Sequence, residues 1–264
     1  MQIFARPYGG LHWREDGDPA GMPLVFANSL GTDLRLWDPL LPHLAAGCRI
    51  IRYDLPGHGL SSGPDGPYAM EGLAQDAADL IEHLGISNPI FVGCSIGGMI
   101  GQALAATRPD LIDGLVLCNT AARMGNAAMW QDRIAQVNAA SLDTIADAIM
   151  ERWFSPAFRA TQDVVLWRTM MARTSAAGYV GCCHALADAD FTQSNPKLDM
   201  PVCAVSGELD LACPPDHVRA TAASVKAASY HQIADIGHLP SIEAPATLGR
   251  LISDFIDEVH HDGS

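Results

Sequence analysis

The sequence predicts an α/β fold: a mostly parallel open sheet with helices on both faces and a helical cap inserted late in the chain. Three observations support this fold class. Short apolar runs of strand length recur along the 264 residues, they do not alternate between polar and apolar positions, and amphipathic stretches lie between them. Continuously apolar strands are typical of a parallel sheet buried on both faces. Strands that alternate with helices are typical of an open α/β sheet.

The expected strands follow the apolar runs in order. They are residues 24–27, 49–53, 89–92, 114–118, 202–205 and 230–234. The clearest helix covers residues 71–84, where Leu73, Ala77 and Leu80 recur on one face. Gly85 follows this stretch and is a suitable helix stop.

The regular alternation breaks between residues 122 and 190, a stretch with helical character throughout. It contains Trp130, Trp153 and Trp167, and five of the ten methionines of the chain. We therefore expect residues 1–121 and 191–264 to form the core and residues 122–190 to form a helical cap. The large apolar side chains of the cap fit either a small core of its own or the lining of an apolar pocket, and the two interpretations are compatible.

Charge and composition exclude several classes of function. The chain has 16 basic and 30 acidic residues, a net charge of −14, and no run of Lys or Arg. A nucleic-acid partner needs a concentrated basic surface, so we exclude one. Residues 85–107 carry no charge and are long enough to span a bilayer, but Pro89 and several glycines interrupt them, which favours a buried strand, turn and helix. No membrane partner is expected.

The cysteine pattern and the N-terminus indicate the compartment. Seven cysteines are an odd number, none has CxxC spacing, and no secretory signal precedes residue 13. Neither a disulfide framework nor a zinc site is indicated. We expect a soluble cytoplasmic protein, and the sequence leaves its oligomeric state open, with a homo-oligomer compatible.

The strongest functional signal is Gly93-Cys94-Ser95-Ile96-Gly97, directly after an expected strand and before an apolar helix. This is the G-x-S-x-G pattern in the strand–turn–helix context in which a serine becomes a nucleophile. The sharp turn projects the hydroxyl above the sheet, and the amides at the helix N-terminus face the developing oxyanion. Ser95 is therefore the candidate nucleophile.

A serine nucleophile needs a base and an acid that orients the base, in the chain order Ser, acid, His. His238 follows the last expected strand and stands beside a glycine, so it is the candidate base. Asp210 ends the strand at 202–206 and is the favoured acid, with Glu208 and Asp235 as rivals. After the preceding strand this architecture offers another place for the acid, but Asn119 stands there and cannot act as a carboxylate.

An oxyanion hole needs two backbone N–H donors. We expect one from Ile96, after the nucleophile, and one from the loop 28–32, where Leu30 occupies the donor position. Ser29 in the same loop is able to supply a hydroxyl to a substrate. His58, in the loop after the strand 49–53, is interpreted as a residue that fixes its loop rather than a catalyst.

With these residues placed, the chain resembles the α/β-hydrolase family, and within it the 3-oxoadipate enol-lactonases. The general resemblance covers the whole chain, and the narrower one rests on the segment 28–37, where Asn-Ser stands in place of the usual His-Gly. Further support comes from the segments 118–123, 129–130 and 178–190. One departure is Cys94, where leucine is expected.

The resemblance implies a serine hydrolase that opens an unsaturated five-ring lactone without a metal or organic cofactor. Its substrate carries a carboxylate, for which Arg123 and Arg133 near the start of the cap are the candidate ligands, with Trp130 packing on the ring. Three alternatives stay open at this point. They are a general carboxylesterase, a carbon–carbon bond hydrolase of the same fold, and a non-catalytic ligand receptor.

Overall fold

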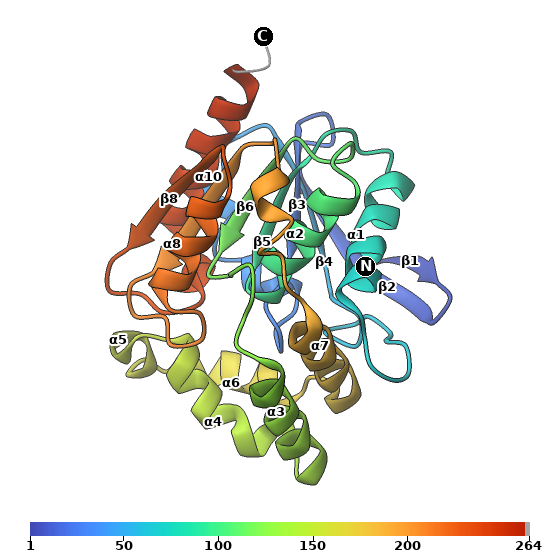
Figure 1. Cartoon of the computed structure of the whole chain (residues 1–264), viewed down its shortest axis with the longest axis vertical. Helices are drawn as coiled ribbons and strands as arrows, with labels where there is room; N and C mark the ends of the chain where they lie inside the picture. The colour runs from blue at the N-terminus through green and yellow to red at the C-terminus, as the bar shows by residue number, and fades with distance from the viewer. Residues whose placement is uncertain (262–264) are drawn as a thin grey trace.

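One sheet of eight strands runs through the computed structural model, which describes residues 1–261, in the order β1-β2-β4-β3-β5-β6-β7-β8 (Figure 1). The strands are β1 (Gln2–Arg6), β2 (Gly9–Gly17), β3 (Met22–Ala27), β4 (Cys48–Tyr53), β5 (Ile90–Cys94), β6 (Gly114–Cys118), β7 (Val202–Gly207) and β8 (Ala228–Ile233). From β4 to β8 every neighbouring pair is parallel, while β1–β2 and β2–β4 are antiparallel. The mostly parallel sheet that the apolar runs predicted is confirmed.

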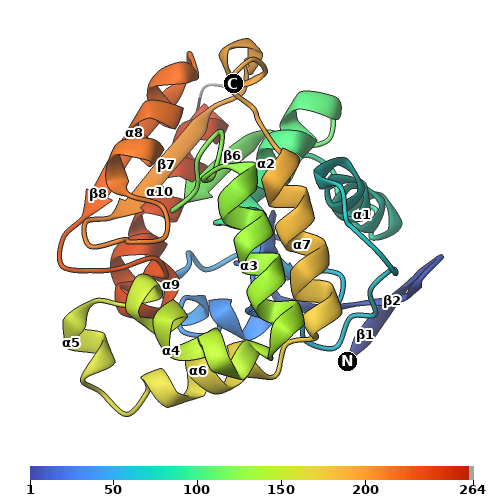
Figure 2. The same cartoon turned by 60° about the horizontal axis from the view of Figure 1, so that its bottom comes forward.

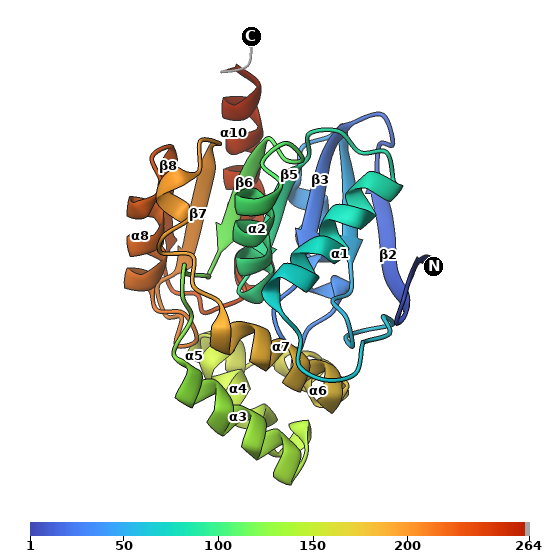
Figure 3. The same ribbon diagram turned by 45° about the vertical axis from the view of Figure 1, so that its right-hand side comes forward.

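Helices cover both faces of this sheet, also as predicted. They are α1 (Met70–His83), α2 (Ile96–Thr107), α3 (Ala127–Ala139), α4 (Leu142–Trp153), α5 (Pro156–Arg159), α6 (Val164–Ala172), α7 (Ala176–Asp188), α8 (Pro215–Ser224), α9 (Pro240–Glu243) and α10 (Pro245–His261), with short 3₁₀ turns at Leu34–Trp37, Leu41–His43 and Asn195–Lys197. Figure 3 shows α1 and α2 on one face of the sheet and α10 on the other. None of the helices within residues 1–261 combines the length and apolarity needed to cross a membrane.

Each strand expected from an apolar run is present, but the N-terminal hairpin β1–β2 was not predicted. Its residues are mostly half-exposed or exposed, so they lack the continuous apolar character of the central strands. The hairpin lies at the edge of the sheet, and Trp13 in the middle of β2 pairs with Tyr53 of β4. An edge strand with one solvated face has a weaker sequence signal than a strand buried on both faces.

The helices α3–α7 are inserted between β6 and β7 and lie across one end of the strands (Figures 1 and 3). In Figure 2, α3 runs alongside α7. The two ends of the insertion are joined, because the Phe191 N–H donates to the Ala122 carbonyl at 2.8 Å. This contact lies at the boundary that we expected for residues 122–190, and we refer to this segment below as the insertion.

The insertion covers the edge at which the parallel strands end. The loops after β3, β5, β7 and β8 all emerge there, and they carry Leu30, Ser95, Asp210 and His238 respectively. Carboxyl ends of parallel strands meet at one edge of an open α/β sheet, and ligands bind at that edge. The fold therefore gathers four distant segments under the insertion.

Candidate active site

Ser95 stands on a strained turn between β5 and α2. Its backbone has φ 57° and ψ −119°, a conformation that non-glycine residues rarely adopt. Two glycines make the turn possible, because a Cβ on Gly93 would lie 2.2 Å from the Gly97 carbonyl oxygen, and one on Gly97 would lie 2.1 Å from the Ala27 oxygen. The strand and helix backbones therefore pass at a distance that side chains would block.

The turn directs the Ser95 side chain into a cavity beneath the insertion. The Ser95 backbone is held by its N–H, which donates to the Cys118 carbonyl at 2.9 Å, and by its carbonyl, which accepts from the Thr120 hydroxyl at 2.7 Å. Within the described residues the Ser95 hydroxyl forms no hydrogen bond with His238, although both residues line the same cavity. Such contacts often tighten only when a substrate is bound.

Asp210 and His238 are brought together, as the chain order led us to expect. His238 Nδ1 lies 2.7 Å from Asp210 Oδ2, and both side chains are almost fully buried. The other carboxylate oxygen, Oδ1, accepts from the backbone N–H groups of Ala212 at 2.7 Å and Cys213 at 2.9 Å. A carboxylate fixed in this way orients the imidazole and leaves its Nε2 for proton transfer.

The two rival acids pair elsewhere. The Glu208 carboxylate accepts a hydrogen bond from the Asp235 backbone N–H at 3.1 Å, at an exposed position. Asp235 itself has φ 61° and occupies the turn before the His238 loop. Neither carboxylate forms a hydrogen bond with His238 in the described structure.

Asn119 has a structural function that the sequence did not reveal. It lies at the end of β6 with φ 48°, and its side chain joins two loops of the site. Its Nδ2 donates to the Gly237 carbonyl at 2.9 Å, and its Oδ1 accepts from the Gly207 N–H at 2.9 Å. The amide thus holds the histidine loop against the end of β7, which requires both a donor and an acceptor in one side chain.

The loop after β3 lines the cavity with Ser29 and Leu30. Asn28 anchors it, because its Nδ2 donates to the Tyr53 carbonyl at 2.7 Å and its Oδ1 accepts from Trp37 Nε1 at 2.8 Å. The backbone N–H of Leu30 has no hydrogen-bond partner within residues 1–261. This amide is free to donate to a ligand, as its predicted function requires.

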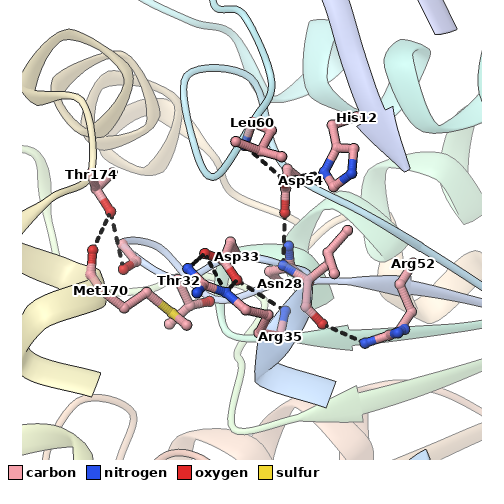
Figure 4. Close-up of polar contacts among 12 residues, drawn as sticks. His12, Asn28, Thr32, Asp33, Arg35, Arg52, Asp54, Leu60, Met170 and Thr174 are labelled. Carbon is pink, nitrogen blue, oxygen red and sulfur yellow. Dashed lines mark hydrogen bonds and ion pairs between the residues drawn. The ribbon is translucent and has the colours of Figure 1, made fainter. Parts of the chain in front are cut away.

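The same loop is held from its far side by Asp54 (Figure 4). Asp54 Oδ1 accepts from the Leu34 N–H at 2.7 Å, and Oδ2 accepts from the Leu60 N–H at 2.9 Å and lies 2.7 Å from His12 Nδ1. Burial raises the pKa of Asp54, and the hydrogen bonds from Leu60, His12 and Leu34 oppose that rise. The loops after β3 and β4 are therefore cross-linked through one buried carboxyl group.

His58 lies outside the cavity, where it was expected to fix its own loop. Its Nδ1 lies 3.1 Å from the Pro56 carbonyl, and its Nε2 is buried without a hydrogen-bond partner. Burial lowers the pKa of His58 to about 4. The ring is therefore neutral at pH 7, with Nδ1–H donating to Pro56.

The cavity has a volume of about 260 Å³ and is lined mainly by apolar side chains. Its lining residues are Ser29, Leu30, Ser95, Met124, Gly125, Met129, Trp130, Arg133, Ile149, Arg152, Trp153, Tyr179, Leu186, Leu211, Ala212, Cys213, Pro214, His217 and His238. Two of the three insertion tryptophans line the cavity, while Trp167 packs near Phe154 within the insertion. Large apolar side chains of the insertion thus both line the pocket and pack against each other within the insertion, the two arrangements that the sequence left open.

Among residues 1–261, no aspartate or glutamate contributes to this lining, although the chain has 30 of them and a net charge of −14. Two arginines do contribute, Arg133 from α3 and Arg152 from α4. Within residues 1–261 neither arginine pairs with a carboxylate, whereas most other arginines do. The cavity therefore has a cationic character that suits an anionic ligand.

The positions of the arginines agree only in part with those expected from the sequence. Trp130 and Arg133 line the cavity as expected, but Arg123 does not. Its guanidinium lies 3.5 Å from Asp190, over half of its side chain is exposed, and it borders a separate surface depression beside α8. Arg123 is therefore not placed to contact a ligand in this cavity, and Arg152, which was not predicted, lies in the cavity instead. A helical spacing from the tryptophan identified Arg133, and no comparable signal marked Arg152.

Cys94, which stands where leucine was expected, is buried beneath the site. The Cys94 thiol lies 3.7 Å from the His238 carbonyl oxygen and does not line the cavity. Burial raises the pKa of Cys94 well above its ordinary value, so the group is a neutral thiol. Among the described residues no cluster of His, Cys, Asp and Glu side chains is arranged to hold a metal ion.

Comparison with known proteins agrees with this geometry. Residues 22–245 match the model of the alpha/beta hydrolase fold family. The chain is 36% identical to 3-oxoadipate enol-lactonase 2 of Acinetobacter baylyi over 202 residues, which are 76% of each protein. A structure of the enol-lactonase from Burkholderia xenovorans superposes with a TM-score of 0.93 at 35% identity, covering 97% of this chain and all of that one.

A more distant structure is also similar. A thermophilic esterase from Thermogutta terrifontis, solved with malate bound, has a TM-score of 0.91 at 27% identity and covers 98% of this chain and all of that one. The family match and the relatives together establish a hydrolase of ester bonds. This chain belongs to the α/β-hydrolase family, and it is similar to 3-oxoadipate enol-lactonases.

Proposed function

We propose that this hydrolase opens the ring of 3-oxoadipate enol-lactone to give 3-oxoadipate, through an acyl-enzyme on Ser95. The observation that carries the proposal is the lining of the cavity at Ser95, which is small, largely apolar and cationic. Such a cavity suits a compact ring that carries a carboxylate. The 36% identity to an enol-lactonase supports the same substrate.

The first half of the reaction forms the acyl-enzyme. Ser95 Oγ attacks the lactone carbonyl carbon while His238 Nε2 accepts the hydroxyl proton, and Asp210 stabilises the resulting imidazolium. The oxyanion accepts hydrogen bonds from the backbone N–H groups of Leu30 and Ile96. Collapse of the intermediate breaks the ring C–O bond, and the leaving oxygen takes the proton from His238. The enol formed then tautomerises to the ketone.

The second half releases the product. A water molecule gives a proton to His238 Nε2 and attacks the acyl carbon, and the second tetrahedral intermediate collapses to a carboxylic acid and the free Ser95 hydroxyl. The leaving group of the first half is an enolate oxygen, which leaves more readily than the alkoxide oxygen of a saturated lactone. The hydrolysis uses residues of this chain and water.

The insertion provides recognition of the ring and its side chain. Trp130 packs on the lactone ring and Arg133 binds the free carboxylate, while Ser29 contributes its hydroxyl from the loop after β3, since all three residues line the cavity. A charged hydrogen bond of this kind contributes about 1.5–3 kcal/mol. Arg133→Met should therefore lower kcat/KM for the free acid by about 10- to 100-fold.

A comparison of substrates tests the proposal. The purified enzyme is given the enol-lactone, a saturated lactone with the same acetate side chain, and a neutral aryl ester. We expect kcat/KM for the enol-lactone to exceed that for both others by at least about 100-fold. Faster turnover of the neutral ester would indicate a general carboxylesterase, which is the alternative favoured by the likeness to the Thermogutta esterase. Absence of turnover on all three would contradict the proposal.

A further inference from the structure

The Tyr179 hydroxyl is available to donate a hydrogen bond to a ligand in the cavity. Its side chain belongs to α7, is only 2% exposed and lines the cavity. Its hydroxyl oxygen accepts a hydrogen bond from Arg133 Nη1 at 3.2 Å. Within residues 1–261 no acceptor is placed to receive the hydroxyl proton. Burying a hydroxyl that has no acceptor for its proton costs free energy, and a ligand that supplies the acceptor removes this cost.

The Tyr179 hydroxyl keeps its proton at neutral pH and can act as a hydrogen-bond donor. Burial raises the pKa of Tyr179, and the nearby charges of Arg133 and Arg152 lower it by less. The hydroxyl is therefore protonated. Because Arg133 already occupies one lone pair of the oxygen, the proton is directed away from that guanidinium.

Arg152 supplies a second cation to the same region. It lies in the last turn of α4, lines the cavity and has no carboxylate partner among the described residues. It lines the same cavity as Arg133 and Tyr179, and its charge lowers the pKa of Tyr179. Elsewhere in the chain, arginines that face acidic side chains are paired, as Arg168 is with Asp143 and Asp147. The two cavity arginines remain available to an external anion.

We propose that Arg152 and Tyr179, together with Arg133, form a carboxylate clamp at the end of the cavity formed by the insertion. This inference rests on the proposed function only in placing the scissile carbonyl at Ser95. A carboxylate has two oxygens and about four acceptor sites, so one group can accept two hydrogen bonds from one guanidinium fork, one from the second arginine and one from the hydroxyl. The clamp makes the enzyme selective for esters and lactones that bear a free carboxylate.

The clamp is assembled from three helices. Arg133 lies on α3, Arg152 on α4 and Tyr179 on α7, and α3 packs directly on α7. Tyr179 also packs on the oxyanion loop, because a Cβ on Gly31 would lie 3.3 Å from its ring. The carboxylate-binding groups are thus held at a fixed place relative to Ser95 by packing rather than by a mobile surface side chain.

The test uses Arg152→Met and Tyr179→Phe, which remove the charge and the hydroxyl while keeping most of the apolar contact. Arg173→Met is the matched control, because Arg173 belongs to the same insertion, is exposed and does not line the cavity. For each variant we would measure kcat/KM for the carboxylate-bearing lactone and for a neutral aryl ester. A second measurement is the inhibition constant of adipate, a simple dicarboxylate, against hydrolysis of the neutral ester.

We expect Arg152→Met to reduce kcat/KM for the acid about 10-fold or more beyond its effect on the neutral ester, and to weaken adipate inhibition by a similar factor. Tyr179→Phe should give a smaller loss in the same direction. The double variant should lose less than the product of the two single losses, because both groups bind one carboxylate. Arg173→Met should change each quantity by no more than about twofold.

Equal losses on the acid and the neutral ester in both variants would overturn the clamp, as would adipate inhibition that neither variant changes. The adipate measurement separates the clamp from the proposed function. If the enol-lactone is not hydrolysed but adipate inhibits the wild type and not Arg152→Met, the clamp stands and the substrate assignment falls. If the lactone is hydrolysed and adipate binds equally to every variant, the assignment stands and the clamp falls.

Discussion

The backbone N–H of His238 donates a hydrogen bond to the carbonyl oxygen of Trp153 at 2.6 Å. The histidine loop of the core is therefore bonded directly to the end of α4 in the insertion. A second link runs beside it, because Glu243 accepts from the Gly237 N–H at 2.8 Å and from the Ser155 hydroxyl at 2.5 Å. Because of these contacts, we expect the position of the imidazole to depend on the packing of the insertion.

Replacement of Glu243 tests this coupling. Glu243→Ala leaves the Gly237 and Ser155 donors without a partner, and we expect the free energy of unfolding to fall by about 1–3 kcal/mol. Because the histidine loop loses an anchor, kcat should fall by a similar factor for acidic and neutral substrates. Glu243→Gln keeps the shape and should be milder. Thermal unfolding and steady-state kinetics provide the measurement.

The matched control for that variant is Glu151→Ala, since Glu151 is exposed on α4 and its carboxylate forms no hydrogen bond or ion pair among residues 1–261. It should leave kcat and unfolding nearly unchanged. A loss in Glu243→Ala confined to the carboxylate-bearing substrate would instead show that its charge acts on the ligand, and the coupling would be refuted.

Replacement of Ser95 tests the nucleophile. Ser95→Ala should fold normally and lose hydrolysis by about 10⁴-fold or more, because the three candidate residues act as a unit. His238→Ala should be comparably severe, and Asp210→Asn somewhat less so. Single-turnover kinetics and far-UV circular dichroism would provide the comparison. More than a tenth of wild-type turnover in Ser95→Ala would mean that another group attacks the substrate.

Replacement of Cys94 tests whether the neighbouring thiol takes part in the reaction. The thiol is buried beneath the His238 carbonyl and is protonated, so we expect Cys94→Ala to keep most of the activity. A thiol reagent should inactivate the wild type only slowly. Peptide mass spectrometry of a trapped acyl-enzyme gives the direct answer, and an acyl group on Cys94 would contradict the assignment of Ser95.

The buried imidazole of His58 predicts a pH dependence of stability. In the folded state its pKa is about 4, against 6.5 for the exposed group, so the unfolded chain binds the proton first as the pH falls. The contribution of His58 to stability is complete above pH 6.5, is lost progressively as the pH falls, and levels off below about 4. The total loss is about 3 kcal/mol.

The measurement is urea unfolding of the wild type and His58→Gln between pH 7 and pH 4. Other groups titrate in the same range, so the difference between the two proteins isolates His58. We expect the wild type to lose more stability than the variant on acidification. Parallel curves would show that His58 titrates normally in the folded protein.

Several features could be predicted from the sequence because they depend on local order. The strands β3 to β8 follow from apolar runs. The turn at Ser95 follows from the glycines around it, which allow the close backbone approaches seen in the structure. The hairpin β1–β2 escaped prediction because its half-exposed residues lack such runs. Asn119 was noticed only as a residue that cannot be an acid, since its two hydrogen-bond partners lie 88 and 118 positions away.

The chain alone predicts the fold class, the candidate nucleophile and the order in which the candidate acid and histidine follow it, because parallel strands bring their carboxyl ends to one edge whatever lies between them. Which side chains meet in the cavity depends on the tertiary packing. In the folded chain His238 pairs with Asp210 rather than Glu208, Arg123 faces Asp190, and Arg152 lines the same cavity as Tyr179. These choices depend on how the helices of the insertion pack against each other and over the sheet, and helix packing between distant segments leaves no local pattern in the chain.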